Sequence, residues 1–188
     1  GKGRILLATE DIEKGDVVLA EPELLGSLAP PTGRERPPKR WRLVAAIESL
    51  REEDRALVED LHDAHAARRG RYVAAARTLV ERGVDLGAPP EDAARWLGIC
   101  RTNAFRDRDG GGSGLFPVAA MAAHSCAPSC DRFLGDDRLF FQARHAIARD
   151  EEITISYVAT TLPAHLRMSA LLARYGFRCD CPRCRAAL

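Results

Sequence analysis

The order of apolar and polar positions divides the chain into two β-rich ends and a helical middle. Residues 4–8 and 17–20 are runs of β-prone side chains on either side of the turn signal Lys14-Gly15-Asp16. Residues 139–143 predict a further strand. Residues 153–157 alternate between apolar and polar side chains, which predicts a half-buried strand that ends on Tyr157.

Residues 41–100 follow helical spacing instead. Apolar residues recur three or four positions apart, as in Trp41, Val44 and Ile47, and this spacing predicts three or four short helices. Residues 89–92, Pro-Pro-Glu-Asp, have the proline and acidic residues typical of a first helical turn. Three later residues of that helix would then face inward: Trp96, Leu97 and Cys100.

One more amphipathic helix is predicted near the carboxyl end, over residues 163–175, with Leu166, Leu171 and Leu172 inside. Residues 30–40 are rich in proline and basic residues and read as an exposed connector, and residues 109–114 as a glycine-rich hairpin tip. Strands, helices and strands follow one another without βαβ alternation. The fold class predicted from this order is therefore α+β.

Composition and charge exclude several classes of protein. The chain has 188 residues, of which 46% are hydrophobic, a fraction too high for a disordered protein. Its 28 basic and 27 acidic residues leave a net charge of +1, so there is no overall electrostatic attraction to nucleic acid. No apolar run approaches the ~18 residues of a membrane span.

The six cysteines are unevenly distributed, with three of them in a C-x-C-x-x-C cluster formed by Cys179, Cys181 and Cys184. Three convergent thiolates suit a tetrahedral Zn²⁺, which requires a fourth ligand from elsewhere in the chain. Residues 124–126, His-Ser-Cys, are the obvious source of this ligand. The spacing alone leaves open whether the histidine or the cysteine binds the metal. The alternative is three free or oxidised cysteines on a frayed tail. Reduced thiolates would favour an intracellular location.

His62 and His65 offer a second arrangement that could hold a metal. They lie three positions apart within the helical middle, a spacing that places two side chains on one helix face. No thiolate or carboxylate constellation supports a metal there, so we interpret both as surface histidines.

Short motifs from the start of the chain to its carboxyl end occur in a recognisable order. They are Gly3-Arg4, Leu6-Leu-Ala8, Asn103-Ala-Phe105, Gly114-Leu-Phe-Pro117, His124-Ser-Cys-Ala-Pro128, Asp150-Glu-Glu-Ile-Thr-Ile-Ser-Tyr157 and Tyr175-Gly-Phe-Arg-Cys-Asp-Cys-Pro-Arg-Cys184. In this order they resemble a SET domain with its post-SET zinc segment. The resemblance is to the SMYD-like branch, whose SET core is split by helices. The MYND zinc finger of that branch has no counterpart among these motifs.

The resemblance implies a β-rich SET fold of small sheets, with a helical insertion and a C-terminal zinc-bound post-SET segment. We expect the split SET domain in residues 1–160, with its insertion at about 41–100, and the post-SET segment in residues 161–188. Cys126 would then be the fourth zinc ligand, beside Cys179, Cys181 and Cys184.

The resemblance also implies an activity, the transfer of a methyl group from S-adenosylmethionine to a lysine ε-amine of a protein such as a histone tail. Tyr157 would be the catalytic residue, orienting the amine and the methyl group, and Tyr175 would line the lysine channel. The cofactor-binding residues would be Gly3, Arg4, Asn103, His124 and Phe177. We expect a protein partner, neither nucleic acid nor membrane, and a location in the nucleus and/or the cytoplasm.

Two departures from the family pattern affect the expected cofactor site. Ala123 stands where the family has the asparagine of Asn-His-Ser-Cys, and Ile5 stands where it has the second glycine of Gly-x-Gly. Losing one or two hydrogen bonds to the cofactor costs roughly 1–3 kcal/mol of affinity. Ile5 also adds a side chain where glycine permits close approach. We favour an active methyltransferase; the alternative is a catalytically silent SET-fold module that binds a partner protein.

Overall fold

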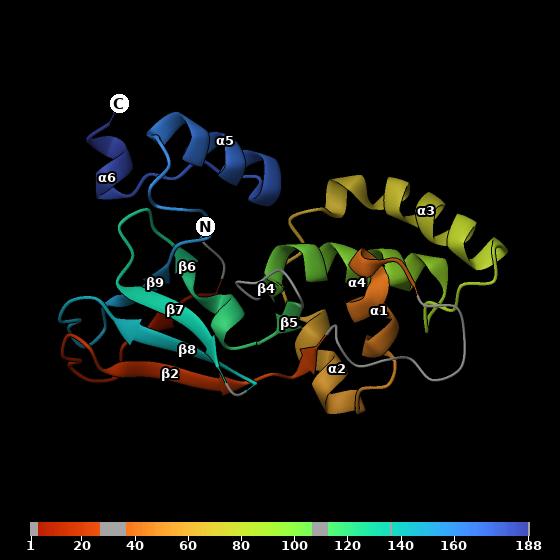
Figure 1. Cartoon of the computed structure of the whole chain (residues 1–188), viewed down its shortest axis with the longest axis horizontal. Coiled ribbons are helices and arrows are strands. Elements are labelled where there is room, and N and C mark those ends of the chain that lie inside the picture. Colours follow the sequence, from red (N-terminus) through yellow and green to blue (C-terminus); the bar gives the residue numbers. More distant parts are fainter. Residues whose placement is uncertain (1–3, 27–36, 107–112, 136, 188) are drawn as a thin grey trace. The chain divides into compact units, whose positions relative to one another are not determined.

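The computed structural model of the chain describes residues 4–26, 37–106, 113–135 and 137–187 (Figure 1). The chain divides into two compact units: Gly1–Pro22 with Met121–Leu188, and Glu23–Ala120. The first unit is therefore built from both ends of the sequence, and the second contains the helical middle. Small sheets and helices occur in separate runs, which confirms the predicted α+β class.

One sheet of the first unit consists of β2 (Val17–Pro22), β8 (Arg138–Ala143) and β7 (Cys130–Gly135), in that antiparallel order. Along β8 the buried residues Leu139, Phe141 and Ala143 alternate with more exposed ones. Such alternation is what a strand shows when one face of its sheet is buried. The strand predicted at residues 139–143 is confirmed.

The other sheet of this unit consists of β1 (Leu6–Leu7), β9 (Glu152–Ile155) and β6 (Ala123–His124). β9 confirms the strand predicted near its position, although it ends two residues before Tyr157. β1 is antiparallel to β9, whereas β6 is parallel to it. The parallel pairing places His124 opposite Ile155, next to the segment that carries Tyr157.

The two N-terminal strands do not pair with each other, although a turn separates them as predicted. Gly15 in that turn has a φ of +97°, which glycine adopts without strain. Between the strands, Ile12 forms a bridge with Ile147. The nine residues from 8 to 16 thus carry the chain from one sheet to the other, so β1 pairs with β9 and β2 pairs with β8.

The first unit ends with α5 (Ala164–Tyr175) and α6 (Pro182–Arg185). α5 confirms the predicted helix and stops at Gly176, whose φ of +76° forms a left-handed C-cap. Leu171 is fully buried, but Leu166 and Leu172 are 46% and 48% exposed, so the prediction that all three face inward is wrong. The buried face carries Arg167 and Leu171, one helical turn apart, and hydropathy alone does not select an arginine for the interior.

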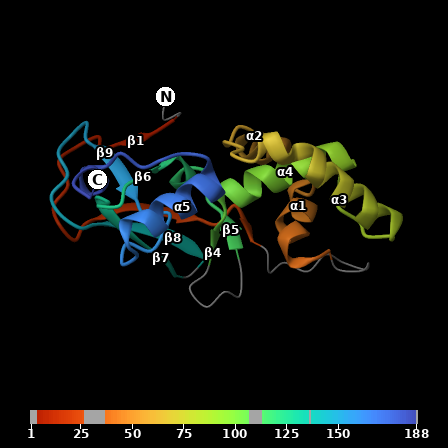
Figure 2. The same cartoon turned by 90° about the horizontal axis from the view of Figure 1, so that it is seen from above.

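The described residues of the second unit form four α-helices, in agreement with the three or four predicted: α1 (Arg42–Ile47), α2 (Glu52–Glu59), α3 (Arg69–Glu81) and α4 (Pro90–Asn103). Short 3₁₀ turns cover Lys39–Trp41 and Ala66–Arg68. α4 packs against the other three helices (Figure 2). Its Trp96, Leu97 and Cys100 are buried, which confirms the predicted inward face.

This unit also holds a small sheet of β3 (Leu25–Gly26), β5 (Ser113–Leu115) and β4 (Phe105–Arg106). β4 and β5 are antiparallel, as the two arms of a hairpin are. The predicted hairpin tip, at residues 109–114, and the predicted connector, at residues 30–40, lie mostly outside the described residues. None of the described helices is both long enough and apolar enough to cross a membrane.

Candidate functional site

Four cysteines converge in the first unit and form what we call the cysteine cluster: Cys126, Cys179, Cys181 and Cys184. Their four sulfur atoms all lie within 4.8 Å of one another. The Sγ of Cys184 is 3.5 Å from that of Cys126, which is 4.0 Å from that of Cys179. A tetrahedral zinc ion with Zn–S bonds of about 2.3 Å requires sulfurs about 3.8 Å apart. The donor set and its spacing therefore fit a structural zinc ion.

The chain reaches the cysteine cluster through a tight turn at its carboxyl end. Cys181 precedes α6 as its N-cap, and Pro182 occupies the first helical position, where a proline is favourable. The backbone N–H groups of Cys184 and Arg185 donate to the carbonyl oxygen of Cys181. This turn directs Cys184 back toward Cys181, which is why the C-x-x-C spacing brings two ligands together.

Within the cysteine cluster, the thiols of Cys181 and Cys179 differ in how readily they ionise. Burial opposes ionisation of Cys181, yet the backbone N–H groups of Cys184 and Cys126, together with the neighbouring thiols, lower its pKa to about 6. Burial raises the pKa of Cys179 to about 12. Thiolates are the form that binds metal, so Cys181 is the readier ligand near neutral pH, and Cys179 loses its proton as the metal binds.

Arg167 is a buried charged residue beside the cysteine cluster that the sequence analysis missed. It is only 2% exposed, its Nη1 donates to the carbonyl oxygen of Leu162, and its Nη2 lies 3.8 Å from the Sγ of Cys184. Four thiolates around one Zn²⁺ carry a net charge of −2, and a buried charge is tolerated when an opposite charge lies beside it. A single arginine within an amphipathic helix gives no sequence signal for this role.

Four rings next to the cysteine cluster form what we call the aromatic cluster: His124, Tyr157, Tyr175 and Phe177. The centroid of the Tyr157 ring lies 4.8 Å from that of Tyr175 and 5.2 Å from that of His124. The Phe177 ring lies 5.9 Å from His124 and 6.4 Å from Tyr175. The rings come from β6, from the segment after β9, and from the end of α5 with the loop that follows it.

A hydrogen bond of its hydroxyl group orients Tyr157 within the aromatic cluster. Its hydroxyl donates to the carbonyl oxygen of Ala122 at 2.6 Å. Burial, with the nearby Tyr175 and Glu152, raises the pKa of Tyr157 to about 12. The hydroxyl is therefore protonated at neutral pH, with its hydrogen directed to Ala122 and its oxygen lone pairs available as acceptors.

His124 is the member of the aromatic cluster whose ring nitrogens contact both Tyr157 and the cysteine cluster. The backbone N–H of Tyr157 donates to its Nδ1 at 3.0 Å, and its Nε2 lies 3.3 Å from the Sγ of Cys126. Burial, and then the charge of Arg167, lowers the pKa of His124 to about 4. The ring is therefore neutral at physiological pH.

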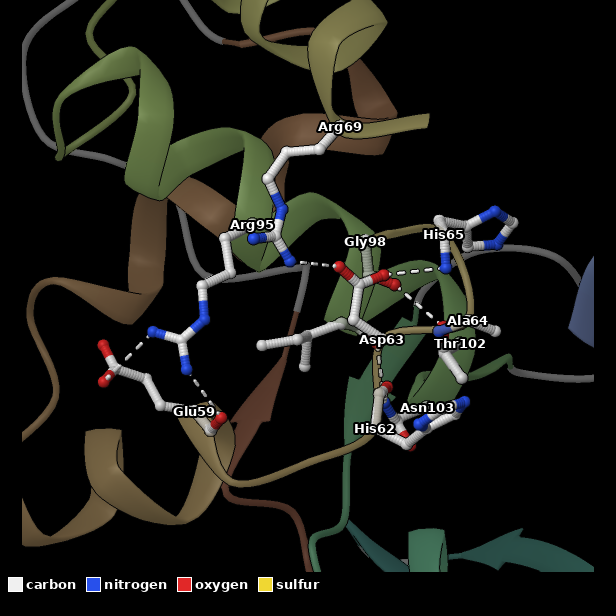
Figure 3. A network of polar contacts seen from close by, with 11 residues as sticks. Glu59, His62, Asp63, Ala64, His65, Arg69, Arg95, Gly98, Thr102 and Asn103 are labelled. Carbon is white, nitrogen blue, oxygen red and sulfur yellow. Dashed lines mark hydrogen bonds and ion pairs between the residues drawn. The ribbon is translucent and has the colours of Figure 1, made fainter. Parts of the chain in front are cut away.

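The remaining residues expected at the cofactor site are not part of the aromatic cluster. Gly3 lies outside the described residues, and Arg4 is exposed. Asn103 ends α4 in the second unit, where its Nδ2 donates to the carbonyl oxygens of His62 and Ile99 at 2.7 and 2.8 Å (Figure 3). Both of its amide hydrogens are thus engaged, which leaves Oδ1 as the atom that can accept from a ligand.

The polar network around Asn103 also corrects the interpretation of His62 and His65 (Figure 3). These residues lie in the loop after α2, so the prediction that they share a helix face is wrong. His62 is exposed, as predicted, whereas His65 is only 4% exposed and is not a surface histidine. Desolvation lowers the pKa of His65. Between them, Asp63 accepts from the backbone N–H of His65 and packs against Gly98, where a Cβ would lie 2.3 Å from its carboxylate. These contacts hold the loop on α4.

Comparisons with known proteins agree on one family. The family model described as "SET domain" matches residues 3–158. Histone-lysine N-methyltransferase ASHR1 of Arabidopsis thaliana is 37% identical over 73 residues, which are 39% of this chain and 15% of that protein. Histone-lysine N-methyltransferase SMYD3 of Mus musculus is 35% identical over 74 residues, 39% of this chain and 17% of that protein. The chain thus matches only a small part of the length of these relatives.

A solved structure shares the fold. The structure of Rubisco LSMT bound to AdoMet aligns with 94% of this chain and 50% of that chain, with a TM-score of 0.64 and 19% sequence identity. The predicted arrangement of small sheets and helices therefore has a counterpart in an experimental structure.

Proposed function

The chain belongs to the SET domain family, and we propose that it transfers a methyl group from S-adenosylmethionine to the ε-amino group of a lysine in a protein. The printed names of its relatives, histone-lysine methyltransferases, support this activity and make a histone tail a candidate substrate. The observation that carries the proposal is the Tyr157 hydroxyl, held neutral and oriented within the aromatic cluster.

The chemistry needs a neutral lysine amine. A lysine side chain with a pKa of ~10.4 is mostly protonated at pH 7, so presenting it as the free amine costs roughly 4–5 kcal/mol. Aromatic walls such as Tyr157 and Tyr175 disfavour the charged form, because they replace water with an apolar surface. The surplus proton leaves to solvent before the transfer.

Tyr157 would orient that amine. Its hydroxyl hydrogen is engaged by Ala122, so its oxygen can accept an N–H from the lysine amine. This contact leaves the nitrogen lone pair directed away from the tyrosine and toward the methyl group, which is the alignment that lowers the barrier. No acid is required, because the departing sulfur becomes a neutral thioether when the S–CH₃ bond breaks and the N–CH₃ bond forms.

The residues present fit the two ends of S-adenosylmethionine, which supplies the electrophilic methyl group. Phe177 is half-buried and packs on His124, so part of its ring can stack on a planar purine. The exposed guanidinium of Arg4 can pair with the carboxylate of the methionine moiety. We also assign cofactor contacts to Gly3, Asn103 and His124, on the strength of the motif resemblance.

We propose the zinc-bound cysteine cluster as the structural centre of a post-SET segment in residues 161–188, following a SET domain in residues 1–160. The end of the family match at residue 158 supports this boundary. We further propose a location in the nucleus and/or the cytoplasm, where thiolates stay reduced, and no direct binding of nucleic acid.

Mass spectrometry of a histone mixture incubated with the chain, zinc and S-adenosylmethionine tests the activity. The expected result is a lysine peptide heavier by one methyl group, absent with Tyr157→Phe. Calorimetric titration with S-adenosylmethionine separates the second candidate, a silent protein-binding module. That candidate is favoured by Ala123 and by Ile5, whose side chain is 40% exposed where the family pattern has glycine. Absence of binding by folded, zinc-loaded protein would support the silent module and contradict the methyltransferase.

A further inference from the structure

The imidazole of His124 connects the cysteine cluster to the backbone of Tyr157. Its Nδ1 is 3.0 Å from the backbone nitrogen of Tyr157, and its Nε2 is 3.3 Å from the Sγ of Cys126. Both distances are short enough for hydrogen bonds, since sulfur acceptors tolerate longer separations than oxygen. One side chain therefore contacts both the metal-ligand set and the proposed catalytic residue.

The first of these hydrogen bonds determines the tautomer. The backbone N–H of Tyr157 can only donate, so the Nδ1 that it contacts must be an acceptor without a hydrogen. In a neutral imidazole the hydrogen then resides on Nε2, which makes Nε2–H a donor toward Cys126. A metal-bound thiolate is a better acceptor for that donor than a thiol is.

The local fold fixes both ends of this connection. Parallel pairing of β6 with β9 places His124 opposite Ile155, two residues before Tyr157. The backbone N–H of Ser125 donates to the carbonyl oxygen of Ile155, so Cys126 follows His124 on the same constrained segment. The ring of His124 is also packed against the rings of Tyr157 and Phe177, which restricts its rotation.

We propose that His124 is a positioning residue that transmits the state of the metal centre to Tyr157, through Nε2–H to Cys126 and through Nδ1 to the Tyr157 backbone. The importance of Tyr157 rests on the proposed function, whereas the connection itself does not. When a metal ion fixes the position of Cys126, the sulfur of Cys126 holds Nε2 of the imidazole. Nδ1 of the same ring then holds the backbone N–H of Tyr157. Loss of the metal releases Cys126 and loosens Tyr157 without any change in the cofactor.

The first test uses the unaltered chain labelled with ¹⁵N and loaded with zinc. The imidazole ¹⁵N spectrum separates protonated from unprotonated ring nitrogens, and the chain has only five histidines. The expected result is one histidine, absent in His124→Asn, with Nε2 protonated and Nδ1 unprotonated, whose Nε2 signal shifts when cadmium replaces zinc. A protonated Nδ1, or an Nε2 signal that stays unchanged when cadmium replaces zinc, would overturn the proposal.

Two matched variants then separate the two hydrogen bonds. The amide oxygen of Asn occupies about the position of Nδ1 and can accept from Tyr157, but it does not reach Cys126. The amide of Gln reaches about the position of Nε2 and can donate to Cys126, but it cannot accept the hydrogen bond from the backbone N–H of Tyr157. Since the chain has three tyrosines, ¹⁹F spectra of 3-fluorotyrosine-labelled protein report Tyr157 individually, with assignment by Tyr157→Phe.

Replacing zinc by cadmium should shift the Tyr157 signal in the unaltered chain and shift it at least about threefold less in both His124→Asn and His124→Gln. An equal shift in all three proteins would show that the backbone pairing of β6 and β9, and not His124, carries the effect. If both variants fail to fold, the ¹⁵N measurement on the unaltered chain still decides, because the shift of its Nε2 signal when cadmium replaces zinc then identifies the histidine without a variant. None of these readouts requires methyl transfer, so absence of activity and absence of the connection are separate results.

Discussion

The hydroxyl of Tyr157 donates a hydrogen bond to the backbone carbonyl oxygen of Ala122, with an O···O distance of 2.6 Å. This contact fixes the direction in which the hydroxyl presents its lone pairs. Tyr157→Phe keeps the ring in the aromatic cluster but removes the acceptor for a lysine amine. We expect methyl transfer to fall by about 100-fold or more, as for a lost alignment of reacting groups, while affinity for S-adenosylmethionine stays nearly unchanged.

The rate is measured by single-turnover methylation and the affinity by calorimetry. Tyr72→Phe, in the second unit, is the matched control and should retain full activity. Equal rates for Tyr157→Phe and the unaltered chain would remove Tyr157 from the proposed mechanism.

Cys181→Ser should lower zinc content and thermal stability together. The variant removes one of four ligands and weakens a site whose binding energy is also folding energy, so a loss of several kcal/mol is expected. In a chain of this size that corresponds to a decrease in Tm of roughly 10 °C. Metal analysis and calorimetric melting measure both quantities. Cys130→Ser, at a buried cysteine outside the cysteine cluster, should keep its zinc.

Arg167→Leu should weaken zinc binding without removing a ligand. The guanidinium of Arg167 lies beside Cys184, and the loss of such an outer partner typically costs 10–100-fold in metal affinity. Competition with a chelator gives the affinity. Arg167→Lys keeps the charge, so its affinity for zinc should decrease less. Arg174→Leu, at an exposed position on the same helix, should leave the affinity for zinc unchanged. Unchanged affinity in Arg167→Leu would show that the arginine serves packing alone.

In an alkaline titration, the hydroxyl of Tyr157 should ionise at a higher pH than an ordinary tyrosine. Burial, with Tyr175 and Glu152 nearby, raises its pKa to about 12, against about 10 in an unfolded chain. The folded chain thus holds a proton that the unfolded chain loses. The resulting stabilisation is complete below pH ~10 and is lost as the pH rises toward ~12. The absorbance of tyrosinate should show an ionisation step near pH 12 that is absent in Tyr157→Phe. A midpoint near pH ~10 for the ionisation of Tyr157 would contradict the raised pKa.

Neighbouring leucines of α5 should differ in their contribution to stability. Leu171 is fully buried, so Leu171→Ala should cost about 2–5 kcal/mol in the free energy of unfolding. Leu172 is 48% exposed, so Leu172→Ala should cost at most about 0.5–1 kcal/mol. Chemical denaturation of zinc-loaded protein compares the two. Similar costs would mean that the helix presents a different face to the interior.

The local elements of the fold could be predicted from residues that are close together in the sequence. Helical spacing identified the block from Trp41 to Cys100, alternation identified β9, and C-x-C-x-x-C identified three members of the cysteine cluster. These signals are local, because a helix, a strand or a tight turn depends on residues a few positions apart. The resemblance in motif order also predicts Cys126 as the fourth member, and its sulfur lies beside the other three.

The contacts between segments that are distant in the sequence could not be predicted in this way and follow from the packing of the folded chain. Arg167 is buried because its helix packs against thiolates that can balance its charge, which hydropathy does not encode. His124 contacts both Tyr157 and Cys126 because β6 and β9 pair in parallel, although 33 positions separate His124 from Tyr157. A connection of this kind depends on strand pairing and side-chain rotation, and these are settled by packing of the whole unit and not by any run of residues.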